Sequence, residues 1–301
     1  MLTDSRPAMR GILLVVLSCA FFAVLDSISK LVIASVPVLM VIWARYLMQA
    51  AFTTAMLTPR YGRALWQVRH PWLQLVRGAL LVGASLLALL SLRFMPVGEF
   101  TAIIMLTPLA VTVLAVFLFQ ERVVPLQWVC VIGGFAGAML IIRPGSGQFG
   151  WVPLLALGCM ASNTGFQLLT SHMARLQENP AATHFLSGWA GAVALTLVLP
   201  LTWSTVASPQ LWMLMGLMGL MGVLGAAGHF LLTLAYQHTS AVTLMPYLYF
   251  QVGFAVLAGM LFFSHAPDGA SLAGMALISC CGAASAWLTA RRKQVPSMLA
   301  R

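Results

Sequence analysis

The sequence predicts an all-α polytopic membrane protein with ten transmembrane helices. Hydrophobic residues fill 61% of the 301 positions, charged residues fill only 7%, and the mean hydropathy is +0.95. A helix of ~20 apolar residues spans ~30 Å of hydrocarbon, and backbone polar groups in lipid must be bonded within their own segment, which favours helices. Stretches of this kind cover residues 11–33, 38–57, 72–92, 97–119, 126–142, 150–173, 181–203, 210–236, 240–263 and 270–290.

The first half of the chain contains five of these stretches, joined by short connections. The stretch 11–33 is longer than a signal-peptide core and lacks a small-residue cleavage site, so we expect it to be retained. The longest connection, 58–71, holds about fourteen residues and leaves no room for a soluble domain. In the fifth stretch, Gly133 and Gly137 have the small-xxx-small spacing that lets helices pack closely in lipid.

The second half shows the same small-residue pattern and one backbone irregularity. Glycine recurs at every third position from Gly216 to Gly228, which predicts close packing of the eighth stretch. In the ninth stretch Pro246 lacks a backbone donor and predicts a kink that opens polar carbonyl groups. In the last stretch Gly282 and Ala286 repeat the small-xxx-small spacing.

The positive charges predict the orientation. Cytoplasmic connections collect Lys and Arg. With the amino terminus inside, eleven basic residues fall on the inner side, and only Arg93 and Arg143 fall on the outer side. The inner residues are Arg6, Arg10, Arg60, Arg63, Arg69, Arg122, Arg175, Arg291, Arg292, Lys293 and Arg301. We therefore expect both termini in the cytoplasm.

The chain repeats itself weakly. Residues 95–102 open the fourth stretch and residues 239–246 open the ninth, each after a short polar corner. Five segments in each half is an odd number, so the second half enters the membrane from the opposite face. We expect two inverted five-helix repeats, 1–145 and 146–301, with a substrate site near the midplane where they meet.

Three motifs resemble the first EamA domain of the drug/metabolite transporter superfamily. They are Leu106-Thr107-Pro108, Phe119-Gln120-Glu121-Arg122 and Gly133-Gly134-Phe135-Ala136-Gly137. The resemblance covers essentially the whole chain, as two EamA domains. In the second copy His265-Ala266 stands where an acid and a base are expected. The resemblance implies a secondary carrier of small metabolites, in many members an exporter, and not an enzyme.

Charge and motif content argue against several other classes. The net charge of +10 is spread over connections and tails, so we expect no nucleic-acid partner. The five cysteines lie in predicted helices without metal-ligand spacing, so we expect packing thiols, no metal and no cofactor. No nucleotide-binding GxxxxGK[ST] loop occurs. The expected partners are a small-molecule substrate and the lipid bilayer. A proton or counter-substrate as the driving species, and a homodimer, are left open.

The most unusual feature is a group of three charged residues in the first two stretches. Ionisable groups inside spans cost ~2.5–3.5 kcal/mol each and usually face a bundle interior or a wet cavity. From the helical rise, Asp26 and Arg45 both lie ~10 Å from the outer surface, and Lys30 is one turn above Asp26. One interpretation is mutual neutralisation. The favoured one is that Arg45 anchors a substrate carboxylate, while Asp26 meets an ammonium or carries a coupling proton.

Other polar groups complete the predicted site. Gln167 stands at the repeat position of Asp26, and Tyr247 and Tyr249 follow Pro246, where they could stack on a substrate or anchor the membrane interface. His229 is deep enough to act as a proton-sensitive gate. Glu99, at the outer start of the fourth stretch, is either a shallow hydrated carboxylate without a role, which the sequence favours, or a gate partner for Arg93.

Together these features predict a carrier of small polar metabolites in the bacterial inner membrane. A substrate with both carboxylate and amine fits the charged group, which favours export of an amino acid or an amino-acid-derived compound such as an opine-type metallophore. One alternative is an importer of riboflavin or S-adenosylmethionine. Another is an intramembrane enzyme, which the short connections disfavour. A third is a helper subunit of another membrane protein.

Overall fold

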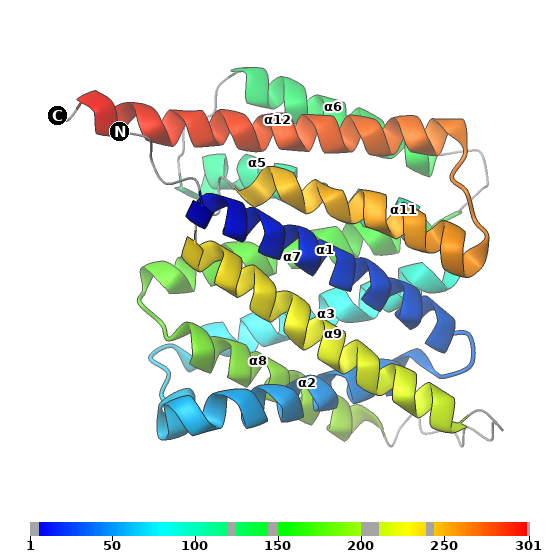
Figure 1. Cartoon of the computed structure of the whole chain (residues 1–301), viewed down its shortest axis with the longest axis vertical. Helices are drawn as coiled ribbons and strands as arrows, with labels where there is room; N and C mark the ends of the chain where they lie inside the picture. The colour runs from blue at the N-terminus through cyan, green and yellow to red at the C-terminus, as the bar shows by residue number, and fades with distance from the viewer. Residues whose placement is uncertain (1–5, 120–124, 144–149, 200–210, 239–243, 300–301) are drawn as a thin grey trace. The chain divides into compact units, whose positions relative to one another are not determined.

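In the computed structural model, helices are the only regular secondary structure of the described residues (Figure 1). The description leaves out residues 1–5, 120–124, 144–149, 200–210, 239–243 and 300–301. The helices of the first half are α1 (Arg6–Val32), α2 (Val38–Tyr61), η1 (Gly62–Trp66), α3 (Pro71–Phe94), α4 (Val97–Ile104), α5 (Thr107–Phe119) and α6 (Pro125–Ile142). Those of the second half are α7 (Val152–Arg175), α8 (Pro180–Val198), α9 (Leu211–His238), η3 (Met245–Tyr249), α11 (Phe250–Phe263) and α12 (Gly269–Leu299).

As far as the structure describes them, the predicted apolar stretches are helical, and two of the stretches are divided. The fourth breaks at Met105 and Leu106, because Pro108 cannot donate a backbone hydrogen bond and disfavours helical geometry before it. The ninth begins with the 3-10 helix η3 around Pro246 and continues as α11, so the predicted irregularity there is confirmed.

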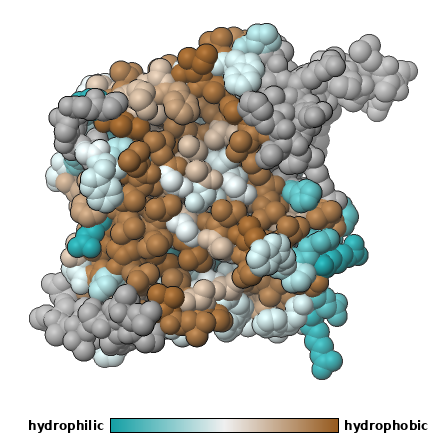
Figure 2. Space-filling view, turned by 180° about the vertical axis from the view of Figure 1, so that it is seen from behind, coloured by the Kyte–Doolittle hydropathy of each residue, from teal (hydrophilic) through white to brown (hydrophobic). Residues whose placement is uncertain are grey.

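The helices identify a multi-pass membrane protein. Seven helices of the described residues are long and apolar enough to cross a membrane, and three apolar helices are shorter: Val97–Val111, Tyr247–Phe263 and Gly269–Ser285. Brown apolar side chains make up most of the described surface in Figure 2. Trp212 and Leu261 are each more than four-fifths exposed, as expected of side chains that face lipid. The count of ten crossings and the cytoplasmic termini remain predictions.

The chain forms two compact units, and each combines segments from both halves of the sequence. Unit 1 contains residues 1–24, 95–153 and 227–301, and unit 2 contains residues 25–94 and 154–226. These units are defined by contacts in space, whereas the predicted boundaries 1–145 and 146–301 divide the sequence into two internal repeats. The repeat boundaries therefore stay a prediction.

In unit 1 the main packing pair is α6 with α12, drawn in green and red in Figure 1. The helices approach closely because Gly137 has no side chain: a Cβ there would lie 2.8 Å from the carbonyl oxygen of Gly274 and 2.9 Å from Ile278. Gly133 lies against Cys281 in the same way. These two contacts show that α6 and α12 run antiparallel, and they confirm the close packing predicted for the fifth stretch.

In unit 2 the main packing pair is α2 with α8, also antiparallel. Gly188 and Gly191 of α8 face Ala50 and the ring of Tyr46 on α2. From α9, Gly222 packs against Met48 of α2. The close packing predicted for the eighth stretch is therefore confirmed at Gly222, whereas Gly216 has no neighbour within 4 Å of its Cβ position.

The cysteines follow the prediction only in part. Cys19, Cys130 and Cys159 are buried packing residues, but Cys281 is half-buried and Cys280 is exposed. The prediction of a buried thiol is wrong for Cys280, because its side of α12 faces outwards and a thiol is apolar enough to lie there.

Candidate transport site

Asp26 and Arg45 come together in unit 2, from α1 and α2. The positive charge of Arg45 acts on the carboxyl group of Asp26. Arg45 also lies against α9, where Nε would be 3.8 Å from a Cβ at Gly225, so the glycine provides the space for the guanidinium. Both charged side chains are half-buried rather than enclosed. Because both side chains remain partly accessible, the carboxylate of a substrate could replace Asp26 at Arg45, and an ammonium group of a substrate could replace Arg45 at Asp26.

Lys30 reaches a different part of the same unit. Its Nζ donates a 2.7 Å hydrogen bond to the carbonyl oxygen of Leu92, in the last turn of α3. The last turn of a helix carries unsatisfied carbonyl groups and a partial negative charge, so a cation is favourable there. This hydrogen bond joins the end of α1 to the end of α3.

The remaining predicted residues divide between the units. Gln167 of α7 is half-buried and belongs to unit 2 with Asp26 and Arg45. Tyr247, Tyr249 and His229 belong to unit 1. The structure therefore gathers the predicted carboxylate anchor in one unit and the predicted aromatic and gating groups in the other.

The two tyrosines have different environments within unit 1. Tyr249 is buried, its hydroxyl group has no hydrogen-bond partner, and its ring lies against Gly282 of α12. Tyr247 is half-buried and stacks on Phe250, with ring centroids 6.4 Å apart. Burial argues against an interfacial anchor at Tyr249, because an anchor keeps its hydroxyl in water. In the same unit, His229 packs edge-on against Phe22 at 4.9 Å.

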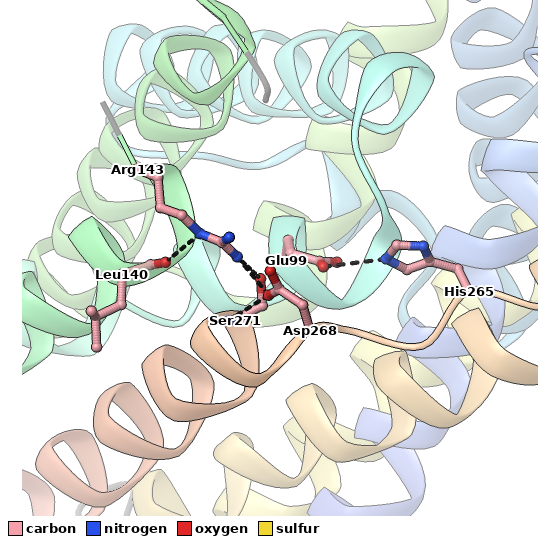
Figure 3. Close-up of polar contacts among 6 residues, drawn as sticks. All are labelled: Glu99, Leu140, Arg143, His265, Asp268 and Ser271. Carbon is pink, nitrogen blue, oxygen red and sulfur yellow. Dashed lines mark hydrogen bonds and ion pairs between the residues drawn. The ribbon is translucent and has the colours of Figure 1, made fainter. Parts of the chain in front are cut away.

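Glu99 is buried at the first turn of α4 and contacts a histidine (Figure 3). Its Oε1 lies 3.3 Å from Nε2 of His265, in the connection between α11 and α12, while Oε2 is buried without a partner. The prediction of a shallow hydrated carboxylate is therefore wrong. All residues of α4 are buried, so the start of this helix lies inside unit 1, although the position of Glu99 near the helix start had suggested exposure to water.

A second polar contact closes the same end of unit 1 (Figure 3). Nη2 of Arg143 donates to Oδ1 of Asp268 at 2.5 Å and to Oγ of Ser271 at 3.1 Å. Nε of Arg143 donates to the carbonyl oxygen of Leu140, which satisfies an end group of α6. The hydrogen bond from Arg143, with those from Ser271, lowers the pKa of the Asp268 carboxyl to about 2. This pair joins α6 to the start of α12.

Sequence reasoning missed two clusters in unit 2. Arg77 of α3 is buried and donates hydrogen bonds to residues of α7 and α8. Glu178 accepts hydrogen bonds from the backbone N–H groups of Arg69 and His70 and pairs with Nδ1 of His70 at 2.8 Å. The available signal for Arg77 was an intramembrane cation with no acid within one helical turn.

Two further predictions concern the Glu121–Arg122 pair and the lack of a metal site. Glu121 and Arg122, the acid–base pair of the second motif, lie outside the described residues. Among the described residues no three His, Cys, Asp or Glu side chains gather closely enough to hold a metal ion.

Comparisons with known proteins agree on the class. Residues 9–143 match the model of the EamA-like transporter family. A riboflavin transporter of Rhizobium johnstonii is 29% identical over 73% of this chain and 71% of its own. An S-adenosylmethionine uptake transporter of Rickettsia conorii is 25% identical over 72% of each chain. A pseudopaline exporter of Pseudomonas aeruginosa is 26% identical over 89% of this chain and 93% of its own.

The fold has a match among solved structures. A structure described as "Crystal structure of protein" aligns with a TM-score of 0.66 at 21% identity, over 97% of this chain and 100% of the other. Apolar helices and transporter relatives define the chain as a multi-pass membrane transporter of small molecules rather than an enzyme. Residues 9–143 are thus similar to the EamA-like transporter family, and the relatives that this chain resembles are transporters.

Proposed function

We propose that this protein is a secondary transporter for small metabolites that carry both a carboxylate and an amine. The observation that carries the proposal is the half-buried Asp26 and Arg45 on adjacent helices of unit 2. A guanidinium binds a carboxylate through two parallel hydrogen bonds, and a carboxylate accepts from an ammonium. One substrate molecule bearing both groups can therefore replace both halves of the pair.

Transport by alternating access requires two arrangements of similar energy, which inverted repeats supply. The contacts within each unit support this part of the proposal. The second and seventh predicted stretches, α2 and α8, pair antiparallel in unit 2. The fifth and tenth, α6 and α12, pair antiparallel in unit 1. Antiparallel contact between corresponding segments is what a two-fold axis in the membrane plane produces. We propose repeats at 1–145 and 146–301.

For direction we propose export of an amino-acid-derived compound from the bacterial cytoplasm across the inner membrane. The similarity to a named exporter over 89% of this chain supports this direction. Uptake of a cofactor-like metabolite is the second candidate, because relatives are named as riboflavin and S-adenosylmethionine transporters. S-Adenosylmethionine itself carries an amino-acid group, so the Asp26–Arg45 pair suits either direction.

For energy coupling we propose a proton or a counter-substrate. Asp26, Glu99 and His229 are the groups that could carry a proton. Oε2 of Glu99 is buried and has no hydrogen-bond partner among the described residues, which supports a role for this carboxyl group beyond its contact with His265. A homodimer remains an alternative to a monomeric carrier.

The test combines substrate identification with a charge-preserving substitution. Metabolite profiles of cells and medium, with and without the gene, show which compound accumulates and on which side. Transport of that compound is then measured in proteoliposomes. Arg45→Lys keeps the charge and loses the planar fork, so we expect transport affinity to fall about tenfold or more. Arg63→Lys, an exposed residue of η1, is the matched control. Unchanged affinity in Arg45→Lys excludes Arg45 as the anchor.

A further inference from the structure

Arg77 is a buried cation whose contacts in unit 2 are all neutral. Only 6% of the residue is exposed. Nε donates to Oγ1 of Thr170 at 2.8 Å, and Nη1 donates to the carbonyl oxygen of Thr183 and to Oγ of Ser187. Arg77 takes part in none of the ion pairs that the described residues form. A buried charge without an opposite charge is costly, so an anion bound here would be stabilised.

The guanidinium presents one edge for such an anion. Of its five N–H groups, one on Nε and two on Nη1 contact Thr170, Thr183 and Ser187, and the two on Nη2 have no acceptor among the described residues. The ring of Phe166 covers one face, 4.3 Å from the guanidinium carbon. The cation is thus held from one edge and one face, and the Nη2 edge remains for a ligand.

The present acceptors can be replaced without leaving unsatisfied groups. The hydroxyl of Thr170 donates to the carbonyl oxygen of Phe166 at 2.6 Å, and that of Ser187 donates to the carbonyl oxygen of Thr183 at 2.8 Å. Each hydroxyl therefore keeps a hydrogen bond within its own helix when Arg77 turns away. Hydrogen bonds from a guanidinium to an anionic oxygen are about twice as strong as those to neutral oxygens, so a carboxylate at the Nη2 edge would draw Arg77 away from the hydroxyls.

A second polar group lies one turn away on the same face of α3. Gln74 is 6% exposed; its Nε2 donates to Oγ1 of Thr183 at 2.9 Å, and its Oε1 is buried with no partner in the described part of the chain. Buried acceptors are nearly always satisfied, so an unpartnered one indicates a missing donor. Positions 74 and 77 are three residues apart, which places both side chains on one side of the helix.

We propose that Arg77 and Gln74 form a second substrate station in unit 2, which binds a carboxylate at Arg77 and an N–H or O–H donor of the same molecule at Oε1 of Gln74. The inference rests on the proposed transport function and narrows its substrate class to small α-amino or α-hydroxy carboxylates. By the predicted orientation Arg77 is ~9 Å from the cytoplasmic start of α3, whereas Arg45 is toward the outer side. Both charges act on Tyr46, so both stations are near that residue.

The experiment measures binding apart from transport. The purified full-length protein is titrated in detergent with lactate and with propionate, which differ only in the hydroxyl group, and thermal stabilisation gives apparent affinities. In the wild type we expect lactate to bind roughly five to ten times more tightly than propionate, the worth of one hydrogen bond. Alanine, with an ammonium in place of the hydroxyl, is expected to behave like lactate.

Three variants separate the two contacts. Arg77→Gln should weaken binding of both acids at least about tenfold, whereas Gln74→Leu should bring the ratio of lactate to propionate affinity close to one. Arg63→Gln is the control for loss of a positive charge and should bind as the wild type does. If Arg77→Gln does not fold, Arg77→Met tests the same contact with a packed apolar chain.

The outcomes are distinct. Wild-type affinity for both acids in the Arg77 variant, or an unchanged ratio in Gln74→Leu, overturns the station. Absence of binding in a wild-type protein that transports in proteoliposomes also overturns it and leaves the proposed function intact. Binding without transport of any carboxylate in proteoliposomes would instead count against the proposed function alone.

Discussion

The buried carboxylate of Glu99 contacts the half-exposed imidazole of His265 at 3.3 Å, and this contact ties the start of α4 to the connection between α11 and α12. The two residues are 166 positions apart in the chain. The histidine occupies the place where the resembling family pattern has an acid and a base. One oxygen of Glu99 thus contacts His265, and the other has no hydrogen-bond partner among the described residues.

Removal of the histidine should destabilise unit 1. In His265→Ala the Glu99 carboxyl loses its described partner while it stays buried, and we expect a loss of about 1–3 kcal/mol. Glu99→Gln should cost less, because an amide is neutral. The double variant should be more stable than the sum of the two single effects predicts. Thermal unfolding in detergent measures all four proteins, and strictly additive effects would show that the contact is energetically silent.

The Arg143–Asp268 pair should make stability depend on acid pH. The pKa of Asp268 is lowered to about 2 from an ordinary value near 3.8, mainly by the hydrogen bond from Arg143. A lowered folded-state pKa contributes stability above the unfolded value, and this is lost as pH falls from about 4 towards 2. Asp268→Asn should flatten that part of the curve and leave pH 5–8 unchanged. A variant that keeps the wild-type acid slope would show that other carboxyl groups cause it.

Proton coupling can be assigned by comparing carboxyl groups. If Asp26 carries the coupling proton, Asp26→Asn should abolish the response of transport to an imposed pH gradient while exchange of substrate persists. The matched variant is Glu99→Gln, which should retain the response in that case. The measurement is substrate flux in proteoliposomes with and without the gradient. A response lost only in Glu99→Gln would assign coupling to unit 1.

Close packing of α6 on α12 should not tolerate a methyl group. A Cβ at Gly137 would lie 2.8 Å from the backbone oxygen of Gly274, so Gly137→Ala requires the helices to separate and should cost about 1–3 kcal/mol. Gly253 of α11, in the same unit, has nothing within 4 Å of its Cβ position, so Gly253→Ala should be neutral or slightly stabilising. Equal unfolding temperatures for the two variants would contradict the packing derived for Gly137.

Helix content was predictable because it depends on local sequence. Runs of apolar residues must form helices in lipid whatever surrounds them, and Pro246 disturbs the backbone in any context. Pro108 carried the same signal for the break before α5, although no break was predicted there. The proximity of Asp26 to Arg45 was also accessible, because helix rise and alternating direction fix depth without any knowledge of packing.

By itself the sequence predicted a helical membrane transporter that resembles the EamA-like family and has charged residues inside its spans. Tertiary structure alone decided which partner each charge has: Glu99 turns to His265, Lys30 to the carbonyl oxygen of Leu92, and Arg77 to neutral groups of α7 and α8. These partners come from helices remote in the chain, and two helices of any apolar sequence can pack at many rotations. Burial and pairing depend on that rotation, which steric contacts at positions such as Gly137 and Gly191 select.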